Sequence, residues 1–228
     1  MNFDFSDEAK ELGEQARKLL AEKAGTGPAR KAMAADAAAM DAALWKEIAE
    51  LGWTAARVPE AHGGLGLTVE EVAQLAEAAG GSLAHVPLVS TLLATEALVL
   101  AGTEAQQAKW LPGIADGSVI ATVALDGQPF VNDMHIANLL IAQRGGQLFA
   151  IPAEHVRSTP QVSVDGARRL FSVEWDEADA ELVVAGDAAL QAANRAFDRG
   201  AVATAAQLIG LSEQMIARMS SSKISAAV

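Results

Sequence analysis

The stretch "LGWTAARVPEAHGGLGLTVEE", residues 51–71, contains a cluster of three glycines, Gly63, Gly64 and Gly66, directly before a helical pattern, in addition to Gly52. A glycine-rich turn at a helix N-terminus can cradle a phosphate group. The two common motifs of this kind are G-x-G-x-x-G after a strand and G-x-x-x-x-G-K-[ST]. Here Val69 stands three residues after Gly66, no lysine follows, and the preceding segment reads as a helix. The glycines are therefore predicted to allow positive φ and a close backbone approach between two helices.

The segments on either side of this stretch carry helix start signals and apolar residues at helical spacing. The signals are residues that cap a helix N-terminus: Ser6, Asp41, Thr68 with Glu71, and Thr103 with Gln106. The alanine-rich segment 30–40, "RKAMAADAAAM", also reads as helix rather than linker. The pattern predicts at least five helices in about the first 115 residues.

After Asp116 the pattern changes to short runs rich in β-branched or aromatic residues, separated by turn residues. Four such runs are predicted strands: residues 118–125, 138–143, 146–152 and 170–175. They predict a small antiparallel sheet or partial barrel. Helical spacing returns after Asp187, where apolar residues from Phe197 to Met219 share one side of a long helix.

The predicted fold class is α+β and mainly α. It has a helical bundle at residues 1–117, a small antiparallel β domain at 118–186 and one long helix in residues 187–228. A lone amphipathic helix cannot bury its apolar stripe. The last helix is therefore predicted to belong to an incomplete helical domain. We expect it to pack on another chain, to swap between protomers, or to be the remnant of an interrupted gene.

Composition and charge exclude several classes of protein. The net charge of −12 argues against a nucleic-acid surface, which needs clustered lysine and arginine. The chain has no cysteine, which excludes disulfides and a thiol nucleophile. The N-terminus lacks the basic start and apolar run of a signal peptide, and the most apolar run, residues 86–101, is too short and polar to span a bilayer. A soluble cytoplasmic protein is expected.

Residues 44–117 resemble the N-terminal helical domain of the acyl-CoA dehydrogenases. In that family a helix ending in Leu-Gly-Trp leads through Val-Pro-Glu to Gly-Gly-Leu-Gly-Leu, and a Gln-containing segment with Leu-Pro follows before the β domain. The matching segments here are 51–53, 58–60, 63–67 and 102–112. The resemblance covers most of residues 1–117, and the order of helices, strands and a final helix also agrees with the family.

The resemblance implies a flavoprotein fold that binds FAD and an acyl-CoA thioester between a helical domain, a β domain and a C-terminal helical bundle. The implied reaction is α,β-dehydrogenation. A carboxylate removes the α-proton, the β-hydride passes to the flavin, and hydrogen bonds to the thioester oxygen make that proton more acidic.

The middle domain departs from the family where the flavin contacts are expected. Family members usually carry Thr-Glu-Pro and then Gly-Ser-Asp after the first strand, whereas this chain reads "ATVALDGQPFVND". The resemblance makes Val123, Leu125 and Asp126 the candidate cofactor-binding residues. The catalytic glutamate of the family lies further along the C-terminal bundle, so no residue of this chain is assigned as the base.

The histidines and one arginine pair are the other candidate site residues. The four histidines, His62, His85, His135 and His155, lack the spacing of metal ligands, so no metal site is predicted. The Arg168-Arg169 pair could meet a CoA phosphate, although exposed arginine pairs at turns usually have no specific ligand.

Two functions remain open from the sequence. The first is an acyl-CoA dehydrogenase-like flavoprotein of lipid degradation that acts in a homo-oligomer or with a partner dehydrogenase subunit supplying the base. The second is a non-catalytic interaction subunit of a hetero-oligomeric dehydrogenase that binds no flavin.

Overall fold

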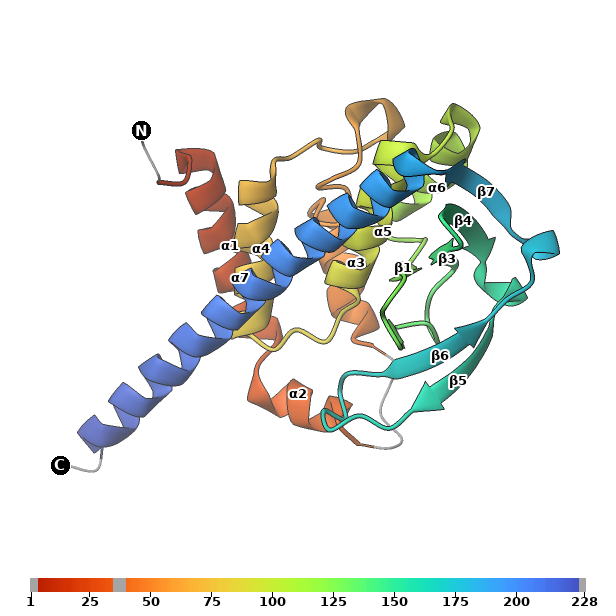
Figure 1. The fold of residues 1–228 in the computed structure, drawn as a ribbon. Coiled ribbons are helices and arrows are strands. Elements are labelled where there is room, and N and C mark those ends of the chain that lie inside the picture. Colours follow the sequence, from red (N-terminus) through yellow and green to blue (C-terminus); the bar gives the residue numbers. More distant parts are fainter. Residues whose placement is uncertain (1–3, 35–39, 226–228) are drawn as a thin grey trace.

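The computed structural model describes residues 4–34 and 40–225, with side chains to residue 220, and the fold is drawn in Figure 1. Helices make up the first half of the chain, as predicted. Their bounds are α1 Asp7–Lys23, α2 Thr26–Ala32, α3 Ala42–Glu50, α4 Val69–Gly81, α5 Leu88–Ala101 and α6 Glu104–Ala115, with a short 3-10 turn at Glu60–His62. Within the alanine-rich segment, residues 30–32 belong to α2, and residues 35–39 lie outside the described residues.

The predicted caps are confirmed. The Ser6 hydroxyl oxygen accepts from the Ala9 N–H at 3.1 Å, and the Asp41 carboxylate accepts from the Leu44 N–H at 3.0 Å. Capping boxes begin α4 and α6. These side chains satisfy backbone donors that the first helical turn leaves unpaired, so each helix begins where its polar residue stands.

The glycine-rich loop has the geometry predicted for it. Gly63 and Gly66 have φ of 81° and 57°, in the left-handed region that favours glycine. Gly64 does not share this conformation. A glycine is required at residue 64 for another reason: a Cβ there would overlap the carbonyl group of Val58. The same carbonyl oxygen accepts a hydrogen bond from the Gly66 N–H at 2.9 Å. The loop therefore folds closely against its own preceding turn.

The strands form two small sheets. Their bounds are β1 Ala121–Ala124, β2 Val131–Asn132, β3 Leu139–Arg144, β4 Gln147–Pro152, β5 Arg157–Gln161, β6 Leu170–Glu174 and β7 Glu181–Ala185, with 3-10 turns at Ala153–His155 and Glu177–Asp179. The first sheet has the order β1-β3-β4-β7 and the second β2-β6-β5.

One strand pairing differs from the antiparallel expectation. β1 and β3 run parallel, with Ala121 opposite Leu139 and Ala124 opposite Ala142. A parallel pair needs a crossover rather than a tight hairpin, and the segment 125–138, which contains β2, supplies it. The sheet is therefore mixed, while the succession of helices, small sheet and long helix agrees with the prediction.

The largest core cluster joins the helices to the first sheet. It includes Leu98 of α5, Ile114 of α6, Ile141 of β3 and Ala150 of β4, all at most 1% exposed. A second cluster lies among α1, α3, α4 and α5, and a third lies between the two sheets, with Phe149 and Trp175 in contact. The helices and the sheets thus share buried surface.

The long final helix, α7 Asp187–Ser225, has 39 residues and lies across α4 and α5. Figure 1 shows its first part lying on the body of the protein and its last part extending beyond it. α4 and α7 meet at glycines, since a Cβ on Gly80 would overlap the carbonyl of Gln207 and one on Gly210 would overlap that of Glu77. The two backbones therefore approach closely.

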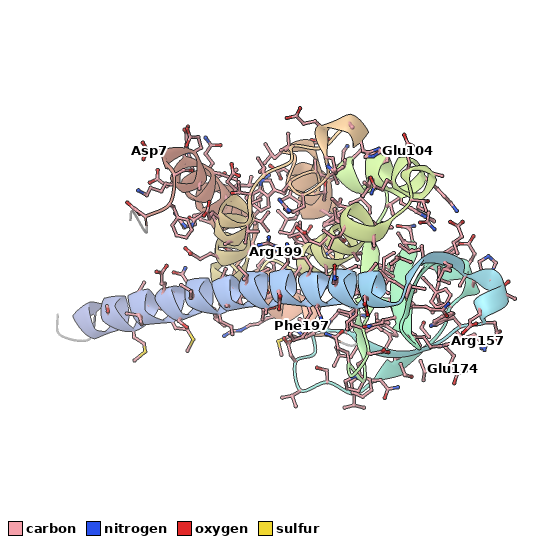
Figure 2. All side chains as sticks on the ribbon, turned by 45° about the horizontal axis from the view of Figure 1, so that its top comes forward. Asp7, Glu104, Arg157, Glu174, Phe197 and Arg199 are labelled. Atoms are coloured by element: carbon pink, nitrogen blue, oxygen red, sulfur yellow. The ribbon has the colours of Figure 1, made fainter. Side chains whose placement is uncertain are left out.

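Apolar side chains remain exposed along α7. They are 43–65% exposed: Leu190, Phe197, Val202, Leu208, Ile209, Met215, Ile216 and Met219. Figure 2 shows Phe197 and Arg199 on different sides of α7, with Arg199 toward the helices. In the described part of the chain, no helix combines the length and apolar character needed to cross a bilayer.

Candidate functional site

A cavity of about 400 Å³ lies where the helices, the second sheet and α7 meet. Its walls come from the α4–α5 connection, the beginning of α5, the segment after β2, the β5–β6 connection and the middle of α7. Its size falls in the range of small-molecule sites. Apolar lining residues include Leu83, Val89 and Leu208, and polar ones include Ser90 and Asp133. The cavity can hold a ligand with both apolar and polar groups.

Two cavity residues have an unusual backbone. Leu83 has φ of 53° and Asp133 has φ of 59°, and within residues 4–34 and 40–225 they are the non-glycine residues with positive φ. A positive φ costs free energy in a residue other than glycine. Residues in this conformation are more frequent at functional sites, where contacts with the surrounding structure stabilise them. Both residues line the same cavity, which supports its role as the functional site.

Asp133 is the partly buried carboxyl group of this cavity. The Ser90 hydroxyl donates to its Oδ2 at 2.6 Å, and its backbone N–H donates to the Arg169 carbonyl oxygen at 3.2 Å. Burial raises the pKa of Asp133 above its ordinary value. The hydrogen bond from Ser90 offsets part of this rise, and the nearby charges of His135, His85 and Arg168 offset it further. The cavity therefore contains a carboxyl group whose charge is costly to maintain.

This carboxyl site was not predicted from the sequence. Ser90 and Asp133 are 43 residues apart. Asp133 ends the segment that stands where the family carries Gly-Ser-Asp, but nothing in that segment points to Ser90. His85 also lines the cavity, and its Nε2 is buried without a hydrogen-bond partner in the described part of the chain. The histidines do not form a metal cluster there: the described residues contain no group of three or more His, Cys, Asp or Glu side chains suited to one.

Arg168 and Arg169 lie in different environments. Arg168 is exposed and lines the cavity, whereas Arg169 is partly buried and accepts the Asp133 N–H through its carbonyl oxygen. Arg168 is therefore the member of the pair that a ligand in the cavity could meet. A contact with a CoA phosphate stays a prediction.

The predicted cofactor residues lie away from this cavity. The side chains of Val123 and Leu125 are 7% and 6% exposed and belong to the largest core cluster. Asp126 is exposed at the turn after β1, and its N–H donates to Gln143 Oε1 at 3.2 Å. The nearby Thr122 hydroxyl already donates to the Asn132 carbonyl at 2.7 Å.

These positions therefore offer a flavin backbone groups and one carboxylate. No hydroxyl or cationic side chain of Val123, Leu125 or Asp126 is available to its polar ring or its phosphates, so their side chains do not fit FAD. Contact through their backbone stays a prediction, and a complete flavin site would need groups from elsewhere.

A second small cavity, of about 20 Å³, marks an ion pair that sequence reasoning missed. Arg57 Nε donates to Glu96, and Arg57 Nη1 donates to the carbonyl oxygen of Leu67. The Glu96 side chain is only 6% exposed. The one available signal was an acidic residue inside the apolar run of residues 86–101. This pair joins the glycine-rich loop to α5.

Comparison with known proteins gives one consistent result. The family model for the acyl-CoA dehydrogenase N-terminal domain matches residues 6–118. The acyl-CoA dehydrogenase IpdE2 of Mycobacterium tuberculosis is 31% identical over 211 residues, which cover 92% of this chain and 62% of that protein. The chain thus spans somewhat under two thirds of the length of this relative.

Solved structures share the fold. The ChsE4–ChsE5 complex from Mycobacterium tuberculosis aligns with a TM-score of 0.78 and 24% identity, covering 94% of this chain and 66% of that one. The Tcur3481–Tcur3483 steroid ACAD G363A variant aligns with a TM-score of 0.77 and 24% identity, covering 91% of this chain and 64% of that one. Three findings agree: the family model matches the helical domain, IpdE2 is similar along nearly the whole chain, and the solved structures share the fold. The chain therefore belongs to the acyl-CoA dehydrogenase family.

Proposed function

We propose that this chain is a subunit of an acyl-CoA dehydrogenase assembly and that the cavity beside Asp133 holds the acyl part of a CoA thioester. The observation that carries this proposal is the cavity of about 400 Å³, which is bounded by the helices, the second sheet and α7 together. The proposed reaction of the assembly is α,β-dehydrogenation with FAD as hydride acceptor, in the degradation of lipids. The proposed location is the cytoplasm.

In this proposal the chain does not complete the reaction alone. The side chains at Val123, Leu125 and Asp126 do not fit a flavin, and in the described part of α7 no Asp or Glu lines the cavity. The base and most flavin contacts would come from another subunit or another part of the protein. The exposed apolar residues of α7 support such an assembly, in a homo-oligomer or with a partner dehydrogenase subunit. The two-component names of similar structures agree with it.

The second candidate is a non-catalytic interaction subunit that binds no flavin. The specific observation in its favour is the burial of Val123 and Leu125 in the core, which leaves few flavin contacts after β1. The exposed residues of α7 serve this candidate equally well.

An absorbance spectrum with added FAD distinguishes the two candidates. The protein is purified alone and with a co-expressed partner dehydrogenase, passed through gel filtration, and sized by light scattering. A flavin band that stays with the protein, together with dehydrogenase activity of the assembly, is the result expected of the enzyme subunit. A stable oligomer without flavin or activity in either preparation would support the interaction subunit and overturn the first proposal.

Blocking the cavity tests the acyl-CoA proposal separately. Thr204 and the adjacent Ala205 of α7 are both exposed, but only Thr204 lines the cavity. We expect Thr204→Trp to weaken binding of hexanoyl-CoA by at least about 10-fold, because the indole would occupy the space of the ligand. Ala205→Trp is the matched control and should leave binding unchanged. Titration calorimetry on the assembled protein measures both, and equal effects of the two variants would contradict the proposed site.

A further inference from the structure

Several contacts fix the position of Asp133, which was not among the candidate cofactor residues although it ends the segment 121–133. Its left-handed backbone, with φ of 59°, turns the chain directly after β2. Its N–H donates to the carbonyl oxygen of Arg169, and its Oδ2 accepts from the hydroxyl of Ser90. A side chain held in this way presents its second oxygen in a defined position.

That second oxygen, Oδ1, has no donor among the described residues: Ser90 is the one side chain there that donates to the Asp133 carboxyl, and it reaches Oδ2. Asp133 is only partly buried, so its Oδ1 is open to the cavity and to water there. A ligand that displaces this water gains affinity only if it supplies a donor to Oδ1 in its place. Asp133 lines the cavity that a ligand would occupy. The site therefore lacks a hydrogen-bond donor at one defined point.

The surroundings decide which kind of donor fits. His85, His135 and Arg168 already stand close enough to Asp133 to act on it electrostatically, and all three carry or can carry positive charge. These groups already compensate the charge of the Asp133 carboxylate, so a cationic ligand group would gain little net attraction from it. Nearby cavity walls are apolar at Val89 and Ile136. A neutral donor on an otherwise apolar group, such as an alcohol, suits this environment best.

We propose that Asp133 makes the cavity selective for acyl groups that carry a hydroxyl, which donates to the carboxylate oxygen that Ser90 leaves open. This inference rests on the proposed binding of a CoA thioester and names its substrate class as hydroxylated acyl groups rather than plain hydrocarbon chains. Asp133 acts here as a residue for specificity.

The acyl part, rather than the CoA part, meets Asp133 in this arrangement. The phosphates of CoA are strongly charged and stay near solvent, where Arg168 is exposed on the cavity wall. Asp133 is less exposed than Arg168 and lies against the side chain of Ser90 at the beginning of α5. The amides of the pantetheine arm are the other neutral donors of such a ligand, and the experiment separates them from the acyl hydroxyl.

The test compares matched thioesters on the assembled protein. Cyclohexanecarbonyl-CoA and its 3-hydroxy and 4-hydroxy forms are titrated by calorimetry into the wild type, Asp133→Asn and Asp165→Asn. Asparagine tolerates the left-handed backbone and can still accept from Ser90, so the first variant is expected to fold. Asp165 is an exposed carboxylate on the same cavity and serves as the matched control.

We expect the wild type to bind one hydroxylated thioester about 10-fold more tightly than the plain one, because a hydrogen bond to a charged acceptor is strong when desolvated. Asp133→Asn should reduce this preference to about 2-fold, since the acceptor loses its charge. Asp165→Asn should leave the preference unchanged. Melting curves of all three proteins serve as the check on folding.

Three other outcomes would overturn the inference. If the thioesters bind without any preference for a hydroxyl, Asp133 does not select for it, although the acyl-CoA proposal survives. If Asp133→Asn weakens the plain and hydroxylated thioesters equally, the carboxylate contacts the pantetheine arm instead. If no thioester binds the wild type, the proposed function itself fails.

The pH dependence supplies a readout that a purely structural role would not give. The hydroxyl preference requires the charged carboxylate, so it should be present at high pH and decline as the pH falls through the pKa of Asp133. Burial raises that pKa, so the decline should begin at a higher pH than an ordinary aspartate would give. A preference that Asp133→Asn leaves intact at every pH would contradict the proposal.

Discussion

We expect the substitution Glu96→Ala to lower the free energy of unfolding by about 3 to 5 kcal/mol. Glu96 is nearly buried in α5 and accepts from the guanidinium of Arg57, whose side chain is 21% exposed. Removing the carboxylate would leave Arg57 charged and largely enclosed. The same guanidinium also holds the carbonyl of Leu67, so the glycine-rich loop would lose its attachment to α5.

An exposed ion pair provides the matched control. Glu181 pairs with Lys109, and their side chains are 44% and 46% exposed. Glu181→Ala should cost less than about 1 kcal/mol, because water already solvates both charges. Urea denaturation of the two variants measures the difference. Equal losses of stability would mean that burial gives the Arg57–Glu96 pair no special weight.

We expect Gly210→Ala to destabilise the protein by about 2 to 3 kcal/mol, although alanine favours a helix over glycine by about 1 kcal/mol. The reason is the crossing of α4 and α7. A Cβ at residue 210 would overlap the carbonyl oxygen of Glu77, and backbone cannot move aside as a side chain can. α7 would have to separate from α4, which would widen the cavity wall near Leu208.

The control for this variant lies on the same helix. A Cβ at Gly200 would meet only the side chain of Leu93, at 2.7 Å from its Cδ2, and that side chain can change rotamer. Gly200→Ala should therefore be neutral or slightly stabilising. Thermal melting of both variants, with a thioester-binding measurement for Gly210→Ala, checks the pair. A Gly210→Ala protein as stable as Gly200→Ala would show that the helices do not need their close approach.

Features that depend on neighbouring residues could be predicted from the sequence. Helix caps are of this kind, because a side chain such as Asp41 or Thr103 bonds a backbone N–H within the next few residues. The glycine-rich loop was also predictable, since its contacts run between Val58 and Gly66. Four of the strands were indicated by their own β-branched and aromatic residues.

Features that depend on distant pairing could not be predicted in this way. β2 has only two residues and β5 contains Pro160, so pairing with β6 rather than local sequence makes them strands. β7, with Val183 and Val184, has a strand pattern of its own, although it was not among the predicted strands. The carboxyl site joins Ser90 to a residue 43 positions away, and Arg57 reaches a glutamate 39 positions away. The predicted cofactor residues Val123 and Leu125 are apolar, and the structure uses them as core.

The shared core of the helices and the first sheet has a consequence for how the chain folds. Leu98, Ile114 and Ile141 pack in one cluster with Ala193 of α7, so the beginning of the last helix is as central as the middle of the sheet. None of these elements can lose its structure without exposing apolar surface on the others. The described chain is accordingly one cooperative unit, in which amide hydrogens of α5 and β3 would exchange with solvent only when the whole unit opens.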